Sequence, residues 1–213
     1  MMADLQDWLA RIQAKITALK EKDPDLNLFG SESHAYKLNQ PLSNQTLTEF
    51  ENEHQITLPQ DYRAFLEQIG NGGMGPYYGL ETLADGLCAS LDYKDEKYGV
   101  QTLSEPFPHT DDWTAPGYKE GMSDEDYDAW QELCFQDKEV FGLLRIANFG
   151  CGVSINLVVN GPSYGEIWVD DRNNDNGVYP DFYFGNEERL GFLEWYELWL
   201  DKSIEEIEQR KNR

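Results

Sequence analysis

The apolar and polar positions of the N-terminal part of the chain follow the period of a helix. Apolar residues recur every three or four positions between charged ones, which predicts an amphipathic helix over residues 1–22. Ser43 then stands where an N-cap is expected, and Leu42 and Leu47 occupy the two positions of a hydrophobic staple. The pattern therefore predicts a second helix that begins after Ser43.

A third helical stretch leads directly into a glycine-rich segment. It is predicted to start at Pro59, because proline lacks the backbone N–H that would stay unpaired in a first helical turn. It is predicted to end in a left-handed turn at Gly70. Gly70, Gly72 and Gly75 match the G-x-G-x-x-G spacing of a dinucleotide-binding loop, but such a loop must precede a helix. Here the loop follows a helix, whose C-terminal partial charge repels phosphate, so we interpret it as a turn. A short strand over residues 77–83 is predicted next.

The C-terminal half has the pattern of a small antiparallel sheet. Residues 143–147 and 153–159 are rich in β-branched and apolar side chains, with glycines marking the connection between them. A third strand is predicted over residues 165–170, after a turn. From residue 190 to about residue 209, large apolar residues lie on one broad helical stripe, which is typical of a core helix and not of a cofactor site. Together these elements predict an antiparallel meander closed by a helix.

Between the two halves lies a turn-rich acidic segment, at about residues 104–139. It carries several aromatic residues, which indicates that it packs onto the core and is not a solvated linker. Ser123 and the acids after it predict a helix start, because acidic side chains in a first turn are stabilised by the helix dipole. We therefore expect a single domain over residues 1–213, with this acidic segment as an insertion.

The charge of the chain restricts the partners that it can bind. Lys and Arg total 17 against 40 Asp and Glu, which gives a formal net charge of −23. This charge opposes binding to nucleic acid or to an anionic membrane and favours a basic partner, although it can also serve solubility alone. The N-terminus lacks the uninterrupted apolar core of a signal peptide, and no apolar run approaches about 20 residues. These features predict a cytoplasmic protein.

The cysteines form no pattern with a clear chemical role. Cys88, Cys134 and Cys151 are widely spaced, which predicts reduced and mostly packed thiols and fits neither a disulfide framework nor a zinc site. Cys151 stands between two glycines, in a tight turn that could display a nucleophile. No nucleophile-elbow pattern surrounds it, so we do not expect catalysis by Cys151.

A calcium-binding loop is suggested by the sequence but is incomplete. Asp171, Asn173 and Asp175 occupy the first three ligand positions of an EF-hand loop, but Asn176 replaces its glycine and Phe182 its final glutamate. Turns of this composition more often satisfy backbone groups between elements. The histidines are scattered and form no closely spaced ligand pair. The sequence therefore predicts no metal, no cofactor and no catalytic residue.

Several segments, taken in order, resemble the SUKH superfamily, which includes fungal Smi/Knr-type cell-wall regulators and bacterial toxin-immunity proteins. They are LPQDYRAFLEQIGNGG followed by YYGL, then RIANFGCGVSINLVVNGPSYGEIWVDDR, then FLEWYELWL. The resemblance extends from Ser43 to Leu200 and rests mostly on turn glycines and core aromatics. Asn148 departs from the pattern, because an acidic residue is expected there, and the helix over residues 1–22 is an added element.

The resemblance implies an α+β fold with a single curved, mainly antiparallel sheet backed by helices. It implies no catalytic residues. Bacterial members commonly bind and neutralise a cognate toxin, often a nuclease, so the implied function is an immunity protein whose acidic surface binds a basic toxin. The alternative, implied by the fungal members, is a regulatory or scaffold protein that binds a native cellular protein.

We expect the partner-binding residues to lie in the acidic insertion. Its carboxylates would steer a basic partner, and its tryptophans would anchor that partner, because buried aromatics tend to dominate interface energies. The competing interpretation is that both tryptophans fix the insertion to the core. The candidate residues are Asp111, Asp112, Trp113, Asp124, Glu125, Asp126, Asp128 and Trp130.

Overall fold

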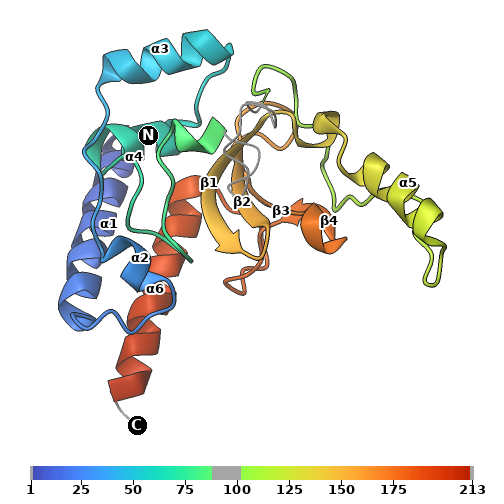
Figure 1. The fold of residues 1–213 in the computed structure, drawn as a ribbon. Coiled ribbons are helices and arrows are strands. Elements are labelled where there is room, and N and C mark those ends of the chain that lie inside the picture. The colour runs from blue at the N-terminus through green and yellow to red at the C-terminus, as the bar shows by residue number, and fades with distance from the viewer. Residues whose placement is uncertain (1, 88–101, 212–213) are drawn as a thin grey trace.

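The helices predicted for the N-terminal part are present in the structure. The computed structural model describes residues 2–87 and 102–211 and is drawn in Figure 1. Ser43 caps its helix as expected, because its Oγ accepts a hydrogen bond of 3.1 Å from the amide of Thr46. Leu42 and Leu47 both pack into the main core. The elements of this part are α1 (Met2–Lys22), α2 (Ser31–His34), α3 (Asn44–His54) and α4 (Gln60–Gln68).

The C-terminal half forms one antiparallel sheet with the strand order β1-β2-β3-β4, which confirms the meander and the α+β class. The sequence pattern does not predict β4, because this strand is short and lies between Gly177 and Pro180. The pairing of β1 with β2 is irregular at two places, and such bulges bend a strand. The elements are α5 (Asp124–Cys134), β1 (Leu143–Gly150), β2 (Val153–Val158), β3 (Ile167–Asp171), β4 (Gly177–Pro180) and α6 (Phe192–Lys211).

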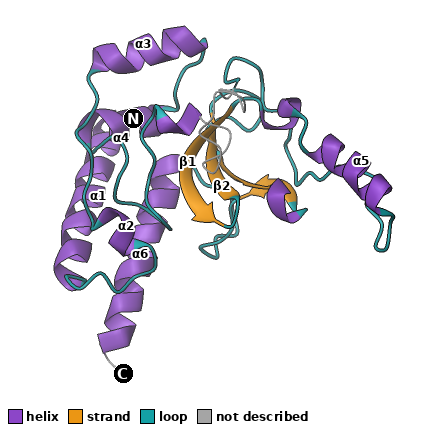
Figure 2. Ribbon diagram, viewed as in Figure 1, coloured by secondary structure: helices purple, strands orange, loops and turns teal. Residues whose placement is uncertain are grey.

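The main core lies between the helices and one face of the sheet (Figure 2). Side chains from α1, α4 and α6 meet strand residues that point inward, such as Ile155 of β2 and Val169 of β3. The opposite face is covered by a smaller cluster around Trp168, whose ring packs edge-on against Phe107 with centroids 4.8 Å apart. Because Phe107 belongs to the acidic insertion, this insertion packs onto the sheet as the sequence predicts.

The N-terminal helix α1 lies beside α6, and the two helices run in the same direction (Figure 1). Trp8 and Arg11 of α1 donate hydrogen bonds to Glu197, and Lys22 pairs with Glu208 further along both helices. The hydrogen bond from Arg11 is the main reason why the pKa of Glu197 falls to about 2. The added N-terminal element is thus attached to α6 by charge as well as by apolar packing.

Stability at acid pH should therefore depend on Glu197. A carboxylate with a lowered pKa stabilises the fold above its unfolded value of 4.5 and loses this contribution as the pH falls towards about 2. We expect Glu197→Gln to reduce the free energy of unfolding at neutral pH by about 1 to 2 kcal/mol, a value lowered by partial solvent screening. Urea denaturation should show the difference from the wild type shrinking as the pH falls from 4.5 towards 2.

Glu205 provides a matched control, because it is exposed on the same helix. We expect Glu205→Gln to change the free energy of unfolding by less than about 0.5 kcal/mol at each pH. Equal losses in the two variants would contradict the role given to Glu197, and so would a Glu197→Gln loss that does not change with pH.

The glycine-rich segment differs from its prediction at Gly70. The helix α4 ends at Gln68 with Ile69 as C-cap, and Gly70 does not have a left-handed φ. A Cβ at Gly70 would lie 2.8 Å from the carbonyl oxygen of Asn39, so the close approach of another segment requires glycine there. The left-handed conformation occurs later in the loop, at Gly72 and Gly73, where φ is 82° and 100°.

The strand predicted over residues 77–83 is also absent. Leu80 instead forms isolated bridges with Gly73 and with Ala147 of β1, and Gly73 forms another with Leu38. The glycine-rich loop therefore lies along the edge of β1 and joins the sheet to the helical part of the molecule. It also covers backbone groups that an open strand edge would offer to another chain.

Candidate functional site

The acidic insertion forms an arm that projects from the sheet on the side away from α1 (Figure 1). Ser123 caps α5 as expected, because its Oγ accepts a hydrogen bond of 3.2 Å from the amide of Asp126. Asp124, Glu125 and Asp128 are exposed around the first turn of α5. Asp126 is exposed as well, but its carboxylate accepts a hydrogen bond from the Ser123 hydroxyl. The start of α5 thus gathers these predicted carboxylates on one turn.

The other two predicted carboxylates lie apart from this turn, in the loop before Trp113. Asp111 and Asp112 are both exposed. The side chain of Asp111 is 88% exposed, and the guanidinium of Arg189 lies 3.5 Å from its carboxylate. Since a surface ion pair of this kind contributes little to stability, Asp111 is available to another partner.

The two predicted tryptophans differ in exposure. Trp130 is 4% exposed, and its indole Nε1 donates a hydrogen bond of 2.8 Å to the carbonyl oxygen of Ala115. Trp113 is partly buried, and its backbone pairs with Val178 of β4 through two hydrogen bonds of 2.8 Å. Its ring packs against both the cluster around Trp168 and the small cluster around Trp130. In this structure both tryptophans hold the arm together and attach it to the sheet.

A partly buried histidine lies where the arm meets the sheet. The ring of His109 stacks on Trp113 with centroids 4.9 Å apart, and its Nε2 is 3.1 Å from the carboxylate of Glu139. Burial lowers the pKa of His109, although Glu139 acts in the opposite direction. His109 thus supports the base of the arm by stacking on Trp113 and by its contact with Glu139.

Further contacts join α5 to the turn between β3 and β4. The hydroxyl of Tyr127 donates a hydrogen bond of 2.7 Å to Asp175, and Arg172 donates one of 3.2 Å to the carbonyl oxygen of Cys134. The Arg172 guanidinium also lies over the ring of Phe135, 5.4 Å from its centroid. These contacts use side chains from both segments, so the position of the arm depends on the β3–β4 turn.

Cys151 lies in the exposed turn between β1 and β2. Its thiol is free and exposed, whereas Cys134 is buried, so the expectation of packed thiols is wrong for Cys151. Cys88 lies outside the described residues. Cys151 has a left-handed φ of 53°, and its carbonyl oxygen accepts a hydrogen bond from the side chain of Asn174. This bond holds the β1–β2 turn against the β3–β4 turn.

The side chains of the incomplete calcium loop make separate contacts. Asp171 accepts hydrogen bonds from Asn174 and Asn176, Asn173 donates to the carbonyl oxygen of Gly152, and Asp175 accepts the bond from Tyr127. No group of three or more metal-ligating carboxylates, histidines or cysteines occurs in the described part of the chain. These side chains satisfy backbone and side-chain groups in the turn.

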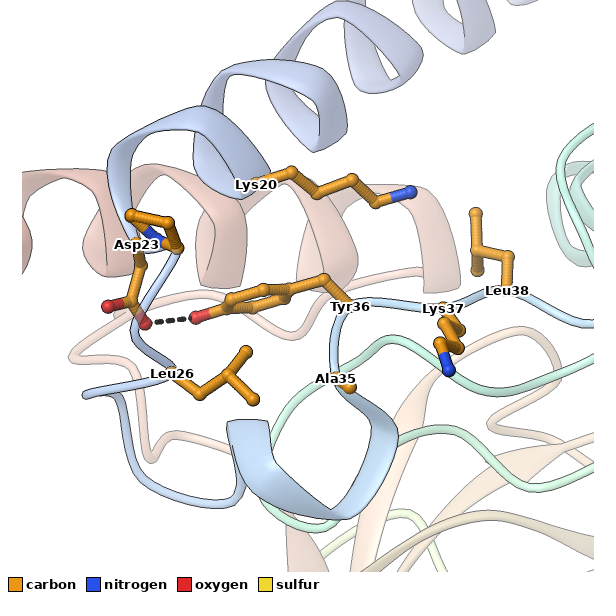
Figure 3. Close-up of a pocket in the computed structure, with 8 residues that line it drawn as sticks. Lys20, Asp23, Leu26, Ala35, Tyr36, Lys37 and Leu38 are labelled. Carbon is orange, nitrogen blue, oxygen red and sulfur yellow. Dashed lines mark hydrogen bonds between the residues drawn. The ribbon is translucent and has the colours of Figure 1, made fainter.

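An open pocket of about 490 Å³ lies between the end of α1 and the segment after α2 (Figure 3). The hydroxyl of Tyr36 points at Asp23 and donates a hydrogen bond of 2.6 Å to it. Burial acts to raise the pKa of Asp23, but the hydrogen bonds from Tyr36 and Asn27 outweigh it and leave that pKa lowered. Lys20 and Lys37 also line the pocket, and neither forms an ion pair with a described residue. The pocket was not evident from the sequence, because its walls come from segments on either side of α2.

The comparisons with known proteins concern the family alone. The model of the SMI1 / KNR4 family (SUKH-1) matches residues 41–197. Neither the curated proteins nor the solved structures include a significant match to the chain. None of the described helices has the length and apolar character needed to cross a membrane. Since the matched residues make up most of the sequence and contain the sheet, the chain belongs to the SMI1 / KNR4 family (SUKH-1).

Proposed function

We propose that this protein is a non-catalytic binding module, and specifically an immunity protein that neutralises a basic toxin. The observation that carries the proposal is the net charge of −23 on a member of this family. A strongly acidic protein attracts basic partners and accelerates their encounter, by about 10- to 1,000-fold in favourable cases. A cytoplasmic, single-domain protein fits this role.

The arm is the part of the surface best placed to steer such a toxin. Its exposed carboxylates lie on a segment that projects from the sheet (Figure 1). A nuclease needs a positive cleft for phosphate, so an acidic arm can occupy that cleft by matching the charge of the nucleic acid. Trp130 supports the arm from within, whereas the partly buried Trp113 remains a candidate contact at its base.

A regulatory or scaffold role is the second proposed function. It rests on membership of the SMI1 / KNR4 family (SUKH-1) and on the cell-wall regulation that the resemblance to its fungal members implies. The two functions differ in the partner that they require, because a toxin would be encoded beside this protein and a regulatory partner need not be. Co-expression of the protein with a toxin domain from the neighbouring gene should restore growth if the first function is correct. Unrestored growth would favour regulation.

Neutralising the arm should slow the capture of the toxin. We expect substitution of five of its exposed carboxylates by amides to lower the association rate at least about 10-fold at low ionic strength, with a smaller effect at high salt. Asp126 is left unchanged because it takes part in the cap of α5. Stopped-flow fluorescence with the purified toxin measures the rate. The substitutions are Asp111→Asn, Asp112→Asn, Asp124→Asn, Glu125→Gln and Asp128→Asn.

A control variant removes the same charge from other exposed positions on the helical side of the molecule. It should lower the association rate by less than about 3-fold if the position of the charge matters. Equal rates for the two variants would mean that only the net charge acts, and an unchanged rate for both would contradict electrostatic capture. The control substitutions are Asp7→Asn, Glu21→Gln, Asp25→Asn, Glu49→Gln and Glu53→Gln.

A further inference from the structure

A second surface, apart from the arm, carries two adjoining groups of aromatic rings. Phe29 lies 5.4 Å from Tyr78, and Phe149 lies 4.9 Å from Tyr183, which in turn lies 6.3 Å from Tyr179, all between ring centroids. The two groups meet at Gly150, because a Cβ there would lie 3.0 Å from the ring of Tyr78. We call these five side chains the aromatic face.

Three rings of the aromatic face are open to solvent. Phe29 is 67% exposed, Tyr78 is 45% exposed and Tyr183 is 42% exposed. Single exposed apolar residues are common on protein surfaces, but rings in mutual contact form a patch, and such patches mark interaction sites. Tyrosine and phenylalanine are also enriched at protein interfaces.

The backbone beneath the aromatic face is strained. Tyr77 has a left-handed φ of 56°, and its ring packs inward against Phe149 and Phe184 while its neighbour Tyr78 stays exposed. Its hydroxyl is buried without a hydrogen-bond partner in the described part of the chain, and burial raises its pKa. Left-handed backbone at a bulky residue costs about 1 to 3 kcal/mol and is concentrated at functional sites. Cys151, also left-handed, follows Phe149 in the next turn.

The segments that build the aromatic face carry negative charge and no positive side chain. Residues 27–36, 76–80, 147–153 and 173–188 contain no Lys or Arg. The same segments contain exposed carboxylates at Glu32, Glu187 and Glu188. The nearest lysine in the sequence, Lys37, lines the pocket of Figure 3. The arginines that border these segments, Arg172 and Arg189, pair with Asp170 and Glu166. Within the segments themselves a cation meets rings and carboxylates.

We propose that the aromatic face binds an arginine-rich segment of a partner protein. An arginine guanidinium is planar and weakly hydrated, so it stacks on aromatic rings more readily than a lysine ammonium does. The surrounding carboxylates and the net charge of −23 attract such a segment. This inference rests on the proposed function as a binder of basic proteins. It names the surface, and the type of partner residue, that slow the dissociation of the complex.

Deca-arginine and deca-lysine peptides of equal charge test the inference. Long-range attraction acts on both peptides, whereas stacking on rings favours arginine. We expect the wild type to bind deca-arginine about 10-fold more tightly than deca-lysine at roughly 0.3 M salt, where exposed charges are largely screened. Fluorescence anisotropy measures both affinities. The preference should disappear in a variant that carries Phe29→Ala, Tyr78→Ala and Tyr183→Ala.

The chain offers a matched control of the same composition and similar exposure. Phe135, Tyr118 and Tyr164 are 42%, 55% and 46% exposed and lie outside the aromatic face. Their replacement by alanine should leave the preference for arginine within about 2-fold of the wild type. Loss of the preference in the control variant, or its survival in the face variant, would overturn the inference.

Amide shifts of the wild-type protein provide a readout that does not depend on the folding of a variant. Deca-arginine should shift the amide signals of Gly150 and Gly152, beside the aromatic face, more than those of Gly117 and Gly121 in the arm. Larger shifts in the arm would overturn the inference. A dimer that the wild type forms and the face variant does not, detected by sedimentation, would overturn it in favour of a second copy of this chain.

Co-expression with the toxin separates this inference from the proposed function. If the wild type and the face variant restore growth equally, the protein is an immunity protein and the aromatic face is not its contact surface. If only the wild type restores growth, the protein is an immunity protein and the aromatic face is part of its contact surface. If neither does, the immunity function fails, and the peptide experiment alone decides what the aromatic face binds.

Discussion

Arg145→Ala is expected to destabilise the protein by about 3 to 5 kcal/mol, because it removes the cation from a buried ion pair. The side chain of Arg145 on β1 is 2% exposed and that of Glu81 is 9% exposed. Their Nε and Oε2 atoms are 2.7 Å apart, and the same guanidinium donates to the carbonyl oxygen of Asp85 at 3.2 Å. Removing the guanidinium thus breaks both an ion pair and a link between β1 and the turn at Asp85. Equilibrium unfolding in urea measures the loss.

An exposed ion pair of the same residue types provides the comparison. Arg210 pairs with Glu206 on α6, and about half of each side chain is exposed. We expect Arg210→Ala to cost less than about 1 kcal/mol, because water replaces the lost partner. Replacing both buried partners, as in Glu81→Gln with Arg145→Met, should recover part of the loss. If Arg145→Ala cost no more than Arg210→Ala, burial of this pair would not control its contribution.

Gly177→Ala is the second substitution that we expect to destabilise the protein strongly, because it should weaken the attachment of the arm to the sheet. Gly177 begins β4 with a left-handed φ of 77°, and a Cβ there would lie 1.9 Å from the carbonyl oxygen of Trp113. Relief of this clash must separate Trp113 from Val178, whose backbone groups form the bridge between arm and sheet. We expect a loss of at least about 3 kcal/mol, made up of backbone strain and overpacking.

Gly185→Ala is the control that separates the cost of the steric clash from the cost of a left-handed backbone. Gly185 has nearly the same φ, 76°, but a Cβ there would meet nothing within 4 Å. Its replacement should cost only about 1 kcal/mol. Hydrogen exchange should show faster exchange in the arm of Gly177→Ala, with protection retained where α1 meets α6. Equal losses in the two variants, or uniform loss of protection in Gly177→Ala, would show that the bridge does not position the arm.

The parts of the fold that depend on local chemistry could be predicted from the sequence. The caps at Ser43 and Ser123 each need only the residues of one turn, and both are present. The order of β1, β2 and β3 also follows from short connections between β-branched runs, whereas β4 is not predicted. The role of Gly70 could not be predicted, because it depends on Asn39, which approaches from a different part of the chain.

In the candidate site, too, local features could be predicted from the sequence, and features that depend on distant contacts could not. Exposure of the six predicted carboxylates in the arm follows from their charge, and the structure has them exposed, whereas Glu139 of the same segment is buried beside His109. The burial of Trp130 depends on Ala115, Tyr118 and Tyr127, which pack around it. The aromatic face has no sequence pattern of its own, because Phe29, Tyr78 and Tyr183 are brought together only by folding.

The contact between α1 and α6 means that the residues that build the core extend beyond the residues that match the family. The match to the SMI1 / KNR4 family begins at residue 41, beyond the end of α1. Leu200 and Ile207 of α6 are nevertheless buried in the same core as Ile12 and Ile16 of α1. A fragment that began at residue 41 and kept all of α6 would expose this apolar surface to water, and large exposed apolar patches favour aggregation. The N-terminal helix therefore completes the core of the family domain to which it is attached.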